Sequence, residues 1–193
     1  MLERFSGDDE WLRLEEEWKQ GKIGSRECLD SQMRGIRLTR KRLDKYLSTI
    51  KIDPSFKKIL KLCKAASIKS VILSDNFDYI LKTILKNNNI DDIDVYCNSV
   101  GFTENGLIPK FPHRGRCDRQ CAHCKTKNLN KVLKRNGISA YVGDGLSDLC
   151  PSKSADLVFA KSTLKKRLTA EKIPHIPFTD LGDVYEYFKR RVA

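Results

Sequence analysis

Apolar residues in the first third of the chain repeat with the period of a helix. Along one stretch they recur three and four residues apart, at Trp11, Leu14 and Trp18. Residues 21–24 interrupt this pattern, and Ser25 then stands where it could cap a second helix that runs through Ile36 towards Leu43. Pro54 suits the first turn of a third helix, because its fixed φ angle is already helical.

Strand patterns begin only after residue 69. Short apolar runs at 70–73, 93–97, 138–142 and 154–161 each predict a buried strand. The last two runs are separated by a short connection, and each ends in polar residues. They therefore indicate neighbouring parallel strands with a site at one edge of the sheet.

Other segments complete the expected fold. The residues Glu104-Asn105-Gly106 predict a hairpin turn between two short strands. Helical periods follow the first strand, over 77–85, and close the chain, over 181–192.

A pair of carboxylates follows the third predicted strand. Asp144 stands between Gly143 and Gly145, and Asp148 comes four residues later. A hard cation such as Mg²⁺ takes oxygen ligands of this kind beside a bound phosphate, and the glycines would let the backbone approach closely. The same residues are also compatible with an ordinary Asp-Gly turn and a helix cap.

The first predicted strand runs into Ser74, Asp75 and Asn76, just before the helix over 77–85. A strand, turn and helix in this order would place the Ser74 hydroxyl near unpaired backbone N–H groups at the start of the helix. Such an arrangement can bind an anion. An ordinary turn or cap serine would give the same pattern.

Three cysteines form a C-x₃-C-x₂-C array at Cys117, Cys121 and Cys124. Thiolates at this spacing can bind one soft metal ion, with His113 or His123 as a fourth ligand. Zinc, redox-labile thiols and simple burial are the alternatives. An iron–sulfur cluster of the radical S-adenosylmethionine type ranks lower, because only a short segment follows the array. Seven cysteines, an odd number, do not indicate the disulfide framework of a small secreted domain.

The formal net charge is +12, from 37 Lys and Arg against 25 Asp and Glu. This charge suits nucleic acid or an anionic substrate, but the basic residues occur in short clusters on helix-like segments without an RNA-binding or zinc-finger signature. Nucleic acid is therefore an unlikely partner. No apolar run reaches the roughly 20 residues that span a membrane, and the acidic start is unlike a signal peptide. We expect a cytoplasmic protein, and the pattern carries no signal for the number of subunits.

The order of these pieces resembles that of the haloacid dehalogenase (HAD) superfamily. Its motifs II, III and IV are matched by the strand with Ser74, by Lys125 at the start of a helix, and by Gly143-Asp144-Gly145 with Asp148. Within the superfamily the chain is similar to the phosphoserine-phosphatase type. The resemblance implies an α/β fold, a three-layer parallel sheet of Rossmann type with a small helical cap. The cap would be residues 1–66 and the core 67–193, with the hairpin and cysteine cluster inserted at about 99–124.

The resemblance also implies a role for each residue. Ser74, with Asp75 and Asn76, would bind the phosphoryl group of a small phosphorylated metabolite, and Lys125 would neutralise its charge. Asp144 would ligate Mg²⁺, and Asp148 would support the metal site. The substrates left open are enol phosphates of methionine salvage, phosphoserine and phospho-amino-alcohols.

One family motif is missing. The superfamily's first and central strand ends in an Asp-x-Asp that supplies the nucleophile, and no apolar strand precedes Leu2. The Asp-x-Asp at Asp92 to Asp94 stands at the beginning of a strand and cannot replace it. We therefore expect a truncated gene product of a Mg²⁺-dependent phosphatase, inactive as written. The alternatives are a non-catalytic homologue that binds phosphate and metal, and a zinc-containing nucleic-acid-binding protein.

Overall fold

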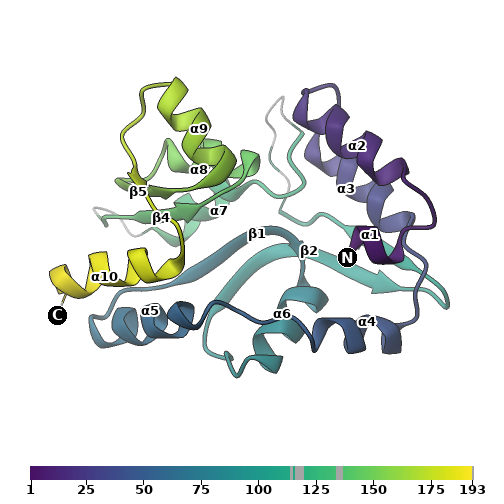
Figure 1. The fold of residues 1–193 in the computed structure, drawn as a ribbon, viewed down its shortest axis with the longest axis horizontal. Coiled ribbons are helices and arrows are strands. Elements are labelled where there is room, and N and C mark those ends of the chain that lie inside the picture. The colour runs from purple at the N-terminus through teal and green to yellow at the C-terminus, as the bar shows by residue number, and fades with distance from the viewer. Residues whose placement is uncertain (114, 116–119, 134–136, 193) are drawn as a thin grey trace. The chain divides into compact units, whose positions relative to one another are not determined.

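The computed structural model describes residues 1–113, 115, 120–133 and 137–192. These residues form two compact units (Figure 1). The first contains Met1–Lys51 and Ile72–Cys124, and the second contains Ile52–Val71 and Lys125–Ala193. Each unit is described by itself.

The helices of the first unit are short and amphipathic. They are α1 (Leu2–Phe5), α2 (Glu10–Lys19), α3 (Ser25–Arg34), α4 (Arg40–Leu47) and α6 (Asp78–Asn87). The helix predicted around Trp11 is confirmed as α2, which packs along α3 (Figure 1).

The long second helix of the sequence prediction was wrong, because it is divided in two. Helix α3 ends at Arg34, and Ile36 instead forms an isolated bridge with Ser6. Thr39 then starts α4 by accepting a hydrogen bond from the backbone N–H of Arg42, which satisfies an unpaired donor of the new helix. Periodicity did not show this break, since Ile36 and Leu43 are both buried on either side of it.

The prediction that Ser25 caps this helix was wrong. Gly24 is the N-cap residue, and Ser25 is the first residue of the helix. Its hydroxyl oxygen accepts a hydrogen bond from the backbone N–H of Ala122, at 2.9 Å. This serine therefore holds the backbone between Cys121 and Cys124 against the start of α3.

The sheet of the first unit has the order β1, β2, β3. Its strands are β1 (Val71–Phe77), β2 (Asp94–Phe102) and β3 (Leu107–Lys110). The predicted hairpin is confirmed, since β2 and β3 are antiparallel and Phe102 pairs with Leu107 across the turn.

The second unit carries the parallel sheet. Its elements are α5 (Pro54–Ala65), α7 (Lys125–Val132), β4 (Ala140–Gly143), a 3₁₀ turn (Leu146–Asp148), α8 (Leu149–Ser152), β5 (Leu157–Ala160), α9 (Ser162–Ala170), β6 (Ile176–Pro177) and α10 (Leu181–Val192). Strands β4 and β5 are parallel, as predicted, and β6 adds to β5 in the same direction. At the start of β4, the Asp156 carboxylate accepts hydrogen bonds from the backbone and the hydroxyl of Ser139.

Helix α5 packs against α10 in the second unit (Figure 1). Asp53 connects the N-terminal ends of these two helices. Its carboxylate accepts hydrogen bonds from the backbone N–H groups of Ser55 in α5 and Leu181 in α10, at 2.8 and 3.1 Å. The sequence prediction had assigned this helix to a cap of residues 1–66. That domain division stays a prediction.

The fold class is α/β, as predicted, and the described strands form two sheets of three. The sequence prediction of one continuous parallel sheet without its central strand is refined accordingly. Strands β1 and β4 are each an edge of their own sheet. Near β4, Ile138 is 88% exposed and Val142 is 40% exposed, which is unusual for apolar residues in or beside a strand of a parallel sheet.

The core of the first unit is continuous across its helices and sheet. Its fully buried members include Met33, Ile36, Leu43, Leu47 and Phe77. Among the described residues, no helix is long and apolar enough to span a membrane.

We predict that Leu43→Ala destabilises the first unit by about 2–5 kcal/mol, because it removes a fully buried side chain and leaves a cavity. Urea unfolding measures this change. The matched control is Leu12→Ala on α2, whose side chain is 51% exposed, and it should alter stability by less than about 0.5 kcal/mol. Equal effects of the two substitutions would contradict the placement of Leu43.

Candidate functional site

Strand β4 delivers the first site residue at its carboxyl end. Along the strand Tyr141 and Gly143 are buried while Ala140 and Val142 are exposed, as the two-residue period of a strand requires. Asp144 follows directly and is exposed to solvent. Ligands bind at the carboxyl ends of parallel strands in α/β proteins, so Asp144 has the position expected of a metal ligand.

Asp148 is buried beside this strand end, with a side chain about 8% exposed. One of its oxygens, Oδ2, accepts hydrogen bonds from the backbone N–H groups of Asp144 and Gly145, at 3.1 and 2.9 Å. The other, Oδ1, accepts from the hydroxyl of Tyr141 at 2.7 Å. The carboxylate therefore shapes the loop that carries Asp144.

Lys125, the first residue of α7, completes the arrangement. Its Nζ donates to Asp148 Oδ1 at 2.7 Å and to the Ser147 hydroxyl at 3.0 Å, and its side chain is 9% exposed. A buried charge is tolerated only when it is paired and hydrogen-bonded. The contacts to Asp148 and Ser147 meet that requirement and hold the ammonium group at one position.

The electrostatics of Asp148 follow from these contacts. Burial by itself would raise the pKa of this carboxyl group. The Lys125 ammonium lowers the pKa through its charge and its hydrogen bond, the donors Gly145 and Tyr141 add to this effect, and together these groups outweigh burial. The net pKa of Asp148 lies below its ordinary value, so the group is ionised at neutral pH.

Gly143 is needed for a steric reason. A Cβ atom at this position would lie 2.8 Å from Cγ and 2.9 Å from Oδ2 of Asp148. At Gly145 the nearest such contact would be 3.6 Å, which is ordinary van der Waals distance. The first glycine of the motif therefore makes room for the Asp148 carboxylate.

Ser74 lies within β1, so the predicted turn at this position was wrong. Strand β1 continues to Phe77 beside β2, and Asn98 of β2 donates a hydrogen bond from its side chain to the carbonyl of Asp75 at 2.7 Å. Helix α6 starts only at Asp78. The Ser74 hydroxyl oxygen accepts from the backbone N–H of Asn76, at 3.1 Å.

His123 contacts the same strand. Its Nδ1 lies 2.8 Å from the carbonyl oxygen of Ser74. A carbonyl oxygen only accepts, so this ring nitrogen must carry the proton and donate. His123 is 2% exposed and stacks on His113, with ring centroids 5.2 Å apart.

The predicted site residues thus fall in two groups. Lys125, Asp144 and Asp148 are neighbours within the second unit, while Ser74, Asp75 and Asn76 belong to the first. A single site made of both groups, with the roles implied by the resemblance, stays a prediction.

The donor set at the end of β4 fits a hard cation. Asp144 offers an exposed carboxylate, which is the ligand type that Mg²⁺ prefers. Both oxygens of Asp148 are already hydrogen-bonded. Asp148 therefore fits the role of a residue that positions the metal-binding loop better than the role of a direct metal ligand.

The cysteine array gives no comparable support for zinc. Cys117 lies outside the described residues. Among the residues that are described, no three His, Cys, Asp or Glu side chains stand close enough to hold a metal. Cys121 and Cys124 are half-buried. The nitrogen of His123 that donates to Ser74 cannot at the same time bind a metal.

Sequence reasoning missed several residues that position this site. Tyr141 and Ser147 contact Asp148 and Lys125. In the first unit, Asn98 holds the carboxyl half of β1, and His123, expected only as a metal ligand, does the same. The two-residue period of β4 is a signal that could have found Tyr141, since it shares a face with Gly143. For Asn98 the signal is weaker, a polar residue within a strand pattern that the structure buries completely.

We predict that Gly143→Ala destabilises the second unit by about 1–3 kcal/mol, because the new methyl group displaces Asp148. The matched control is Gly145→Ala, which has room and a φ angle of −101° that alanine adopts. Chemical denaturation of both variants measures the difference. Equal stability of the two would show that Asp148 does not lie against Gly143.

We predict that Asp148→Asn costs about 3–5 kcal/mol at neutral pH, because it leaves the Lys125 ammonium buried without its partner. The folded-state pKa of Asp148 is lowered, so the carboxylate stabilises the fold fully above its ordinary pKa of about 4. That contribution is lost as the pH falls through the folded-state pKa.

The stability gap between the wild type and Asp148→Asn should therefore narrow below about pH 4. Unfolding free energies measured from pH 7 to pH 3 give this gap. Glu186→Gln, on the exposed side of α10, is the control with the same loss of charge and should show no such dependence. A gap that widens towards acid would contradict the assignment.

Comparison with known proteins places these features in a family. Residues 27–173 match the model of the Putative Phosphatase family. The 2-hydroxy-3-keto-5-methylthiopentenyl-1-phosphate phosphatase of Geobacillus thermodenitrificans is 30% identical over 150 residues, which cover 77% of this chain and 68% of the relative. The phosphatase of the same name from Brevibacillus brevis is 27% identical over 179 residues, covering 91% of this chain and 81% of the relative.

Solved structures are similar in fold. A substrate-bound phosphoserine phosphatase superposes with a TM-score of 0.68 at 21% identity, covering 93% of this chain and 84% of the other. The phosphoserine phosphatase of T. onnurineus gives a TM-score of 0.64 at 16% identity, covering 92% and 79%. With the family match over residues 27–173, these findings agree with the motif order read from the sequence. The chain belongs to the Putative Phosphatase family, and its fold is similar to that of phosphoserine phosphatases.

Proposed function

We propose that this chain provides the phosphate-binding and metal-binding part of a Mg²⁺-dependent phosphomonoester phosphatase that acts on a small phosphorylated metabolite. The observation that carries this proposal is the buried ion pair of Lys125 and Asp148, next to the exposed carboxylate of Asp144 at a strand end. The family match and the named relatives support the same reaction class.

Lys125 supplies the positive charge of the proposed mechanism. In phosphoryl transfer, negative charge spreads over the phosphoryl oxygens, and catalysis consists mainly of positioning and electrostatic stabilisation. The hydrogen bonds to Asp148 and Ser147 orient the ammonium group before substrate binds. The group then need not reorganise during the reaction.

Asp144 would hold Mg²⁺, and Asp148 would hold the loop that presents Asp144. A bound Mg²⁺ ion would neutralise charge on the phosphoryl oxygens. The Ser74 hydroxyl, with the polar residues that follow it on β1, would hydrogen-bond the phosphoryl group.

The nucleophile is the part of the reaction that these residues do not supply. The only Asp-x-Asp of the 193 residues joins Asp92 to Asp94, and Asp94 begins β2. A carboxylate that begins a strand lies at the end opposite to the carboxyl end of that strand, where ligands bind in α/β proteins. We propose that the 193 residues bind phosphate and metal without turnover, and that hydrolysis needs an added strand ending in Asp-x-Asp.

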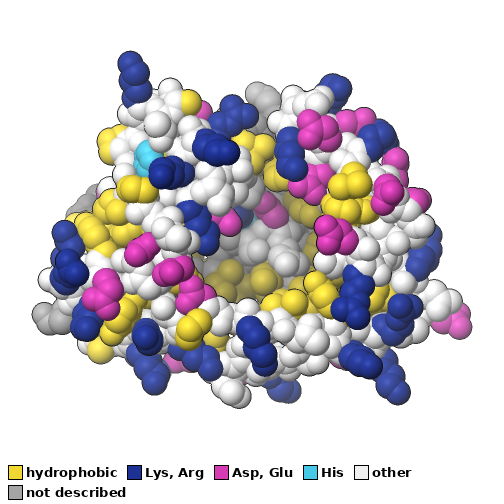
Figure 2. Space-filling view, in the orientation of Figure 1, with side chains coloured by type: hydrophobic (Ala, Val, Ile, Leu, Met, Phe, Trp, Pro, Cys, Tyr) yellow, Lys and Arg dark blue, Asp and Glu magenta, His cyan; other side chains and the backbone are white. Residues whose placement is uncertain are grey.

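Two other functions remain as alternatives to test. The first is a homologue that binds phosphate and metal as a sensor. The second is a nucleic-acid-binding protein with zinc. On the face shown in Figure 2, Lys and Arg lie singly or in small groups among acidic and apolar side chains. Such a distribution differs from the continuous basic stripe that a nucleic-acid phosphate backbone favours.

We predict that the purified chain binds inorganic phosphate in the presence of Mg²⁺, measured by isothermal titration calorimetry, and releases no phosphate from phosphomonoesters. Asp144→Asn should abolish the dependence on Mg²⁺, and Lys125→Ala should weaken phosphate binding by at least about tenfold, which corresponds to the loss of one charge-assisted contact. Asp91→Asn, in an exposed loop, is the control for lost negative charge.

A fusion tests the catalytic half of the proposal. An apolar strand ending in Asp-x-Asp, joined before Met1, should restore Mg²⁺-dependent phosphate release, and Asp144→Asn in the fusion should abolish it. A fusion that binds phosphate yet stays inactive would favour the sensor function. Steeply salt-dependent RNA or DNA binding without phosphate binding would favour the nucleic-acid-binding function.

A further inference from the structure

The cysteine array is the sequence motif that the proposed function leaves unused. Two of its members, Cys121 and Cys124, are described, and both are reduced and half-buried. Cys117 lies outside the described residues. Two cysteines in a C-x-x-C spacing are typical of thiols that are oxidised to a disulfide and reduced again.

The backbone between the two cysteines bends at Ala122 and His123. A disulfide requires Cα atoms about 4.4–6.8 Å apart, and a bend across two residues is the backbone form that brings residues i and i+3 this close. Ala122 and His123 are 0% and 2% exposed. The loop therefore buries its two inner residues and leaves the two cysteines partly accessible, as a reaction with a soluble disulfide requires.

Backbone hydrogen bonds hold this loop at both ends. The carbonyl oxygen of Gln120 accepts from a backbone N–H at the start of α3, at 3.2 Å, and the backbone N–H of Cys124 donates to the carbonyl oxygen of His113, at 2.8 Å. Between these ends, Ala122 is fixed on α3 and His123 on β1. A loop that is already confined in this way loses little further conformational freedom when a disulfide closes it.

Three other described cysteines are less suited to this reaction. Cys28, Cys63 and Cys97 are buried. Burial raises the pKa of Cys28 and of Cys97 to about 11, so these two groups stay protonated at neutral pH. Only the thiolate attacks a disulfide. Cys150, half-buried on α8 of the second unit, provides a comparison outside the C-x-x-C spacing.

We propose that Cys121 and Cys124 form a reversible dithiol–disulfide pair, which a low-molecular-weight disulfide such as glutathione disulfide oxidises. One thiolate attacks the glutathione disulfide, forms a mixed disulfide and releases one glutathione. The second thiolate attacks the protein sulfur of that mixed disulfide, closes the bond between Cys121 and Cys124 and releases the second glutathione. The protein loses two electrons to glutathione disulfide, and the two thiol protons pass to the two released glutathione molecules.

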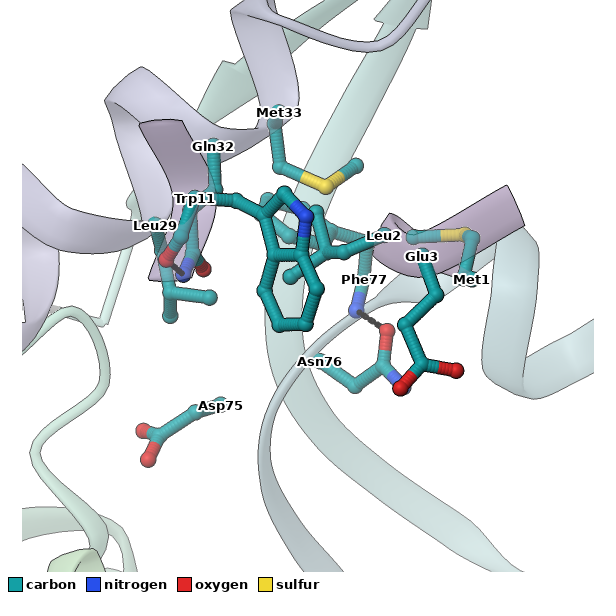
Figure 3. A pocket seen from close by; sticks show the side chains of 10 residues that line it. All are labelled: Met1, Leu2, Glu3, Trp11, Leu29, Gln32, Met33, Asp75, Asn76 and Phe77. Atoms are coloured by element: carbon teal, nitrogen blue, oxygen red, sulfur yellow. Dashed lines mark hydrogen bonds between the residues drawn. The ribbon is translucent and has the colours of Figure 1, made fainter. Parts of the chain in front are cut away.

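The disulfide would act on β1 through His123. This residue holds the carbonyl oxygen of Ser74, and Ser74 directly precedes Asp75 and Asn76, which line a pocket of about 440 Å³ in the first unit (Figure 3). Neither cysteine lines this pocket. Oxidation therefore leaves the composition of the pocket unchanged and locks the loop that holds the carboxyl half of the strand.

A single tryptic peptide tests this proposal. Trypsin cleaves after Arg119 and Lys125, so both cysteines fall in the peptide of residues 120–125, and Cys117 falls in another. The folded protein is equilibrated with reduced and oxidised glutathione, and its remaining thiols are blocked before digestion. We expect this peptide to escape blocking and to be about 2 Da lighter than its dithiol form, because two hydrogen atoms are lost. Its disulfide form should exceed its glutathione adduct at least about tenfold, because the second thiol attacks from within the same loop.

Variants test the mechanism and the role of the loop. Cys121→Ser and Cys124→Ser each remove the thiol that displaces glutathione, so the remaining cysteine should accumulate the adduct. Cys150→Ser should leave the disulfide unchanged. Ser25→Ala removes a hydrogen bond that confines the loop, and should lower the ratio of disulfide to dithiol by about fivefold. Ser31→Ala, at an exposed position of the same helix, should not change this ratio.

Three results would overturn the proposal. They are an unmodified dithiol peptide in a buffer that modifies Cys150, a wild type in which the glutathione adduct of peptide 120–125 accumulates, and a disulfide between this peptide and the one that contains Cys117. None of these measurements involves phosphate or Mg²⁺, so their results do not bear on the proposed phosphatase function.

Discussion

The arrangement at the end of β4 depends on one buried ion pair. Lys125 and Asp148 have both been removed from water, and such a pair is tolerated only when the remaining donors and acceptors are satisfied. Tyr141, Ser147 and the backbone of Gly145 meet this requirement. Because these groups come from β4, the following loop and α7, the pair fixes the strand end against the start of the helix.

The buried ion pair also explains why the loop after β4 can present a carboxylate for metal binding. Asp148 uses its oxygens to hold the loop and the ammonium group, which leaves the exposed Asp144 as the carboxylate directed to solvent. Asp148 therefore has the structural role, and the neighbouring Asp144 is left for the proposed function. Gly143 makes this division possible, since any larger residue would occupy the space of the Asp148 side chain.

In the first unit, the feature of interest is the carboxyl half of strand β1. Strand β1 is held along its carboxyl half by His123 and Asn98, and its last residues face a pocket with apolar walls. Polar residues and the wall of an apolar space thus follow one another along a single strand.

Secondary structure was the part of the fold that local sequence could predict. The parallel pair β4 and β5, the hairpin after β2, and the helices beginning at Pro54 and Leu181 follow from apolar period and turn chemistry. The helix that begins at Lys125 was implied by the family resemblance. Three boundaries failed, at Ser25, Ile36 and Ser74. At Ile36 and Ser74 a long-range contact decided the backbone, a bridge to Ser6 in one case and pairing with β2 in the other.

The sequence by itself determined the chemistry that is available: the order of Ser74, Lys125, Asp144 and Asp148 along the chain, and the absence of an Asp-x-Asp after an apolar strand. Spacing along a chain carries this information because catalysis needs particular groups at strand and helix ends. Only the tertiary structure decided which carboxylate is buried by Lys125 and Tyr141 and which stays exposed. It also decided that Trp11, Met33 and Asp75 line one pocket. Burial and pairing depend on residues distant in sequence, and no local pattern encodes them.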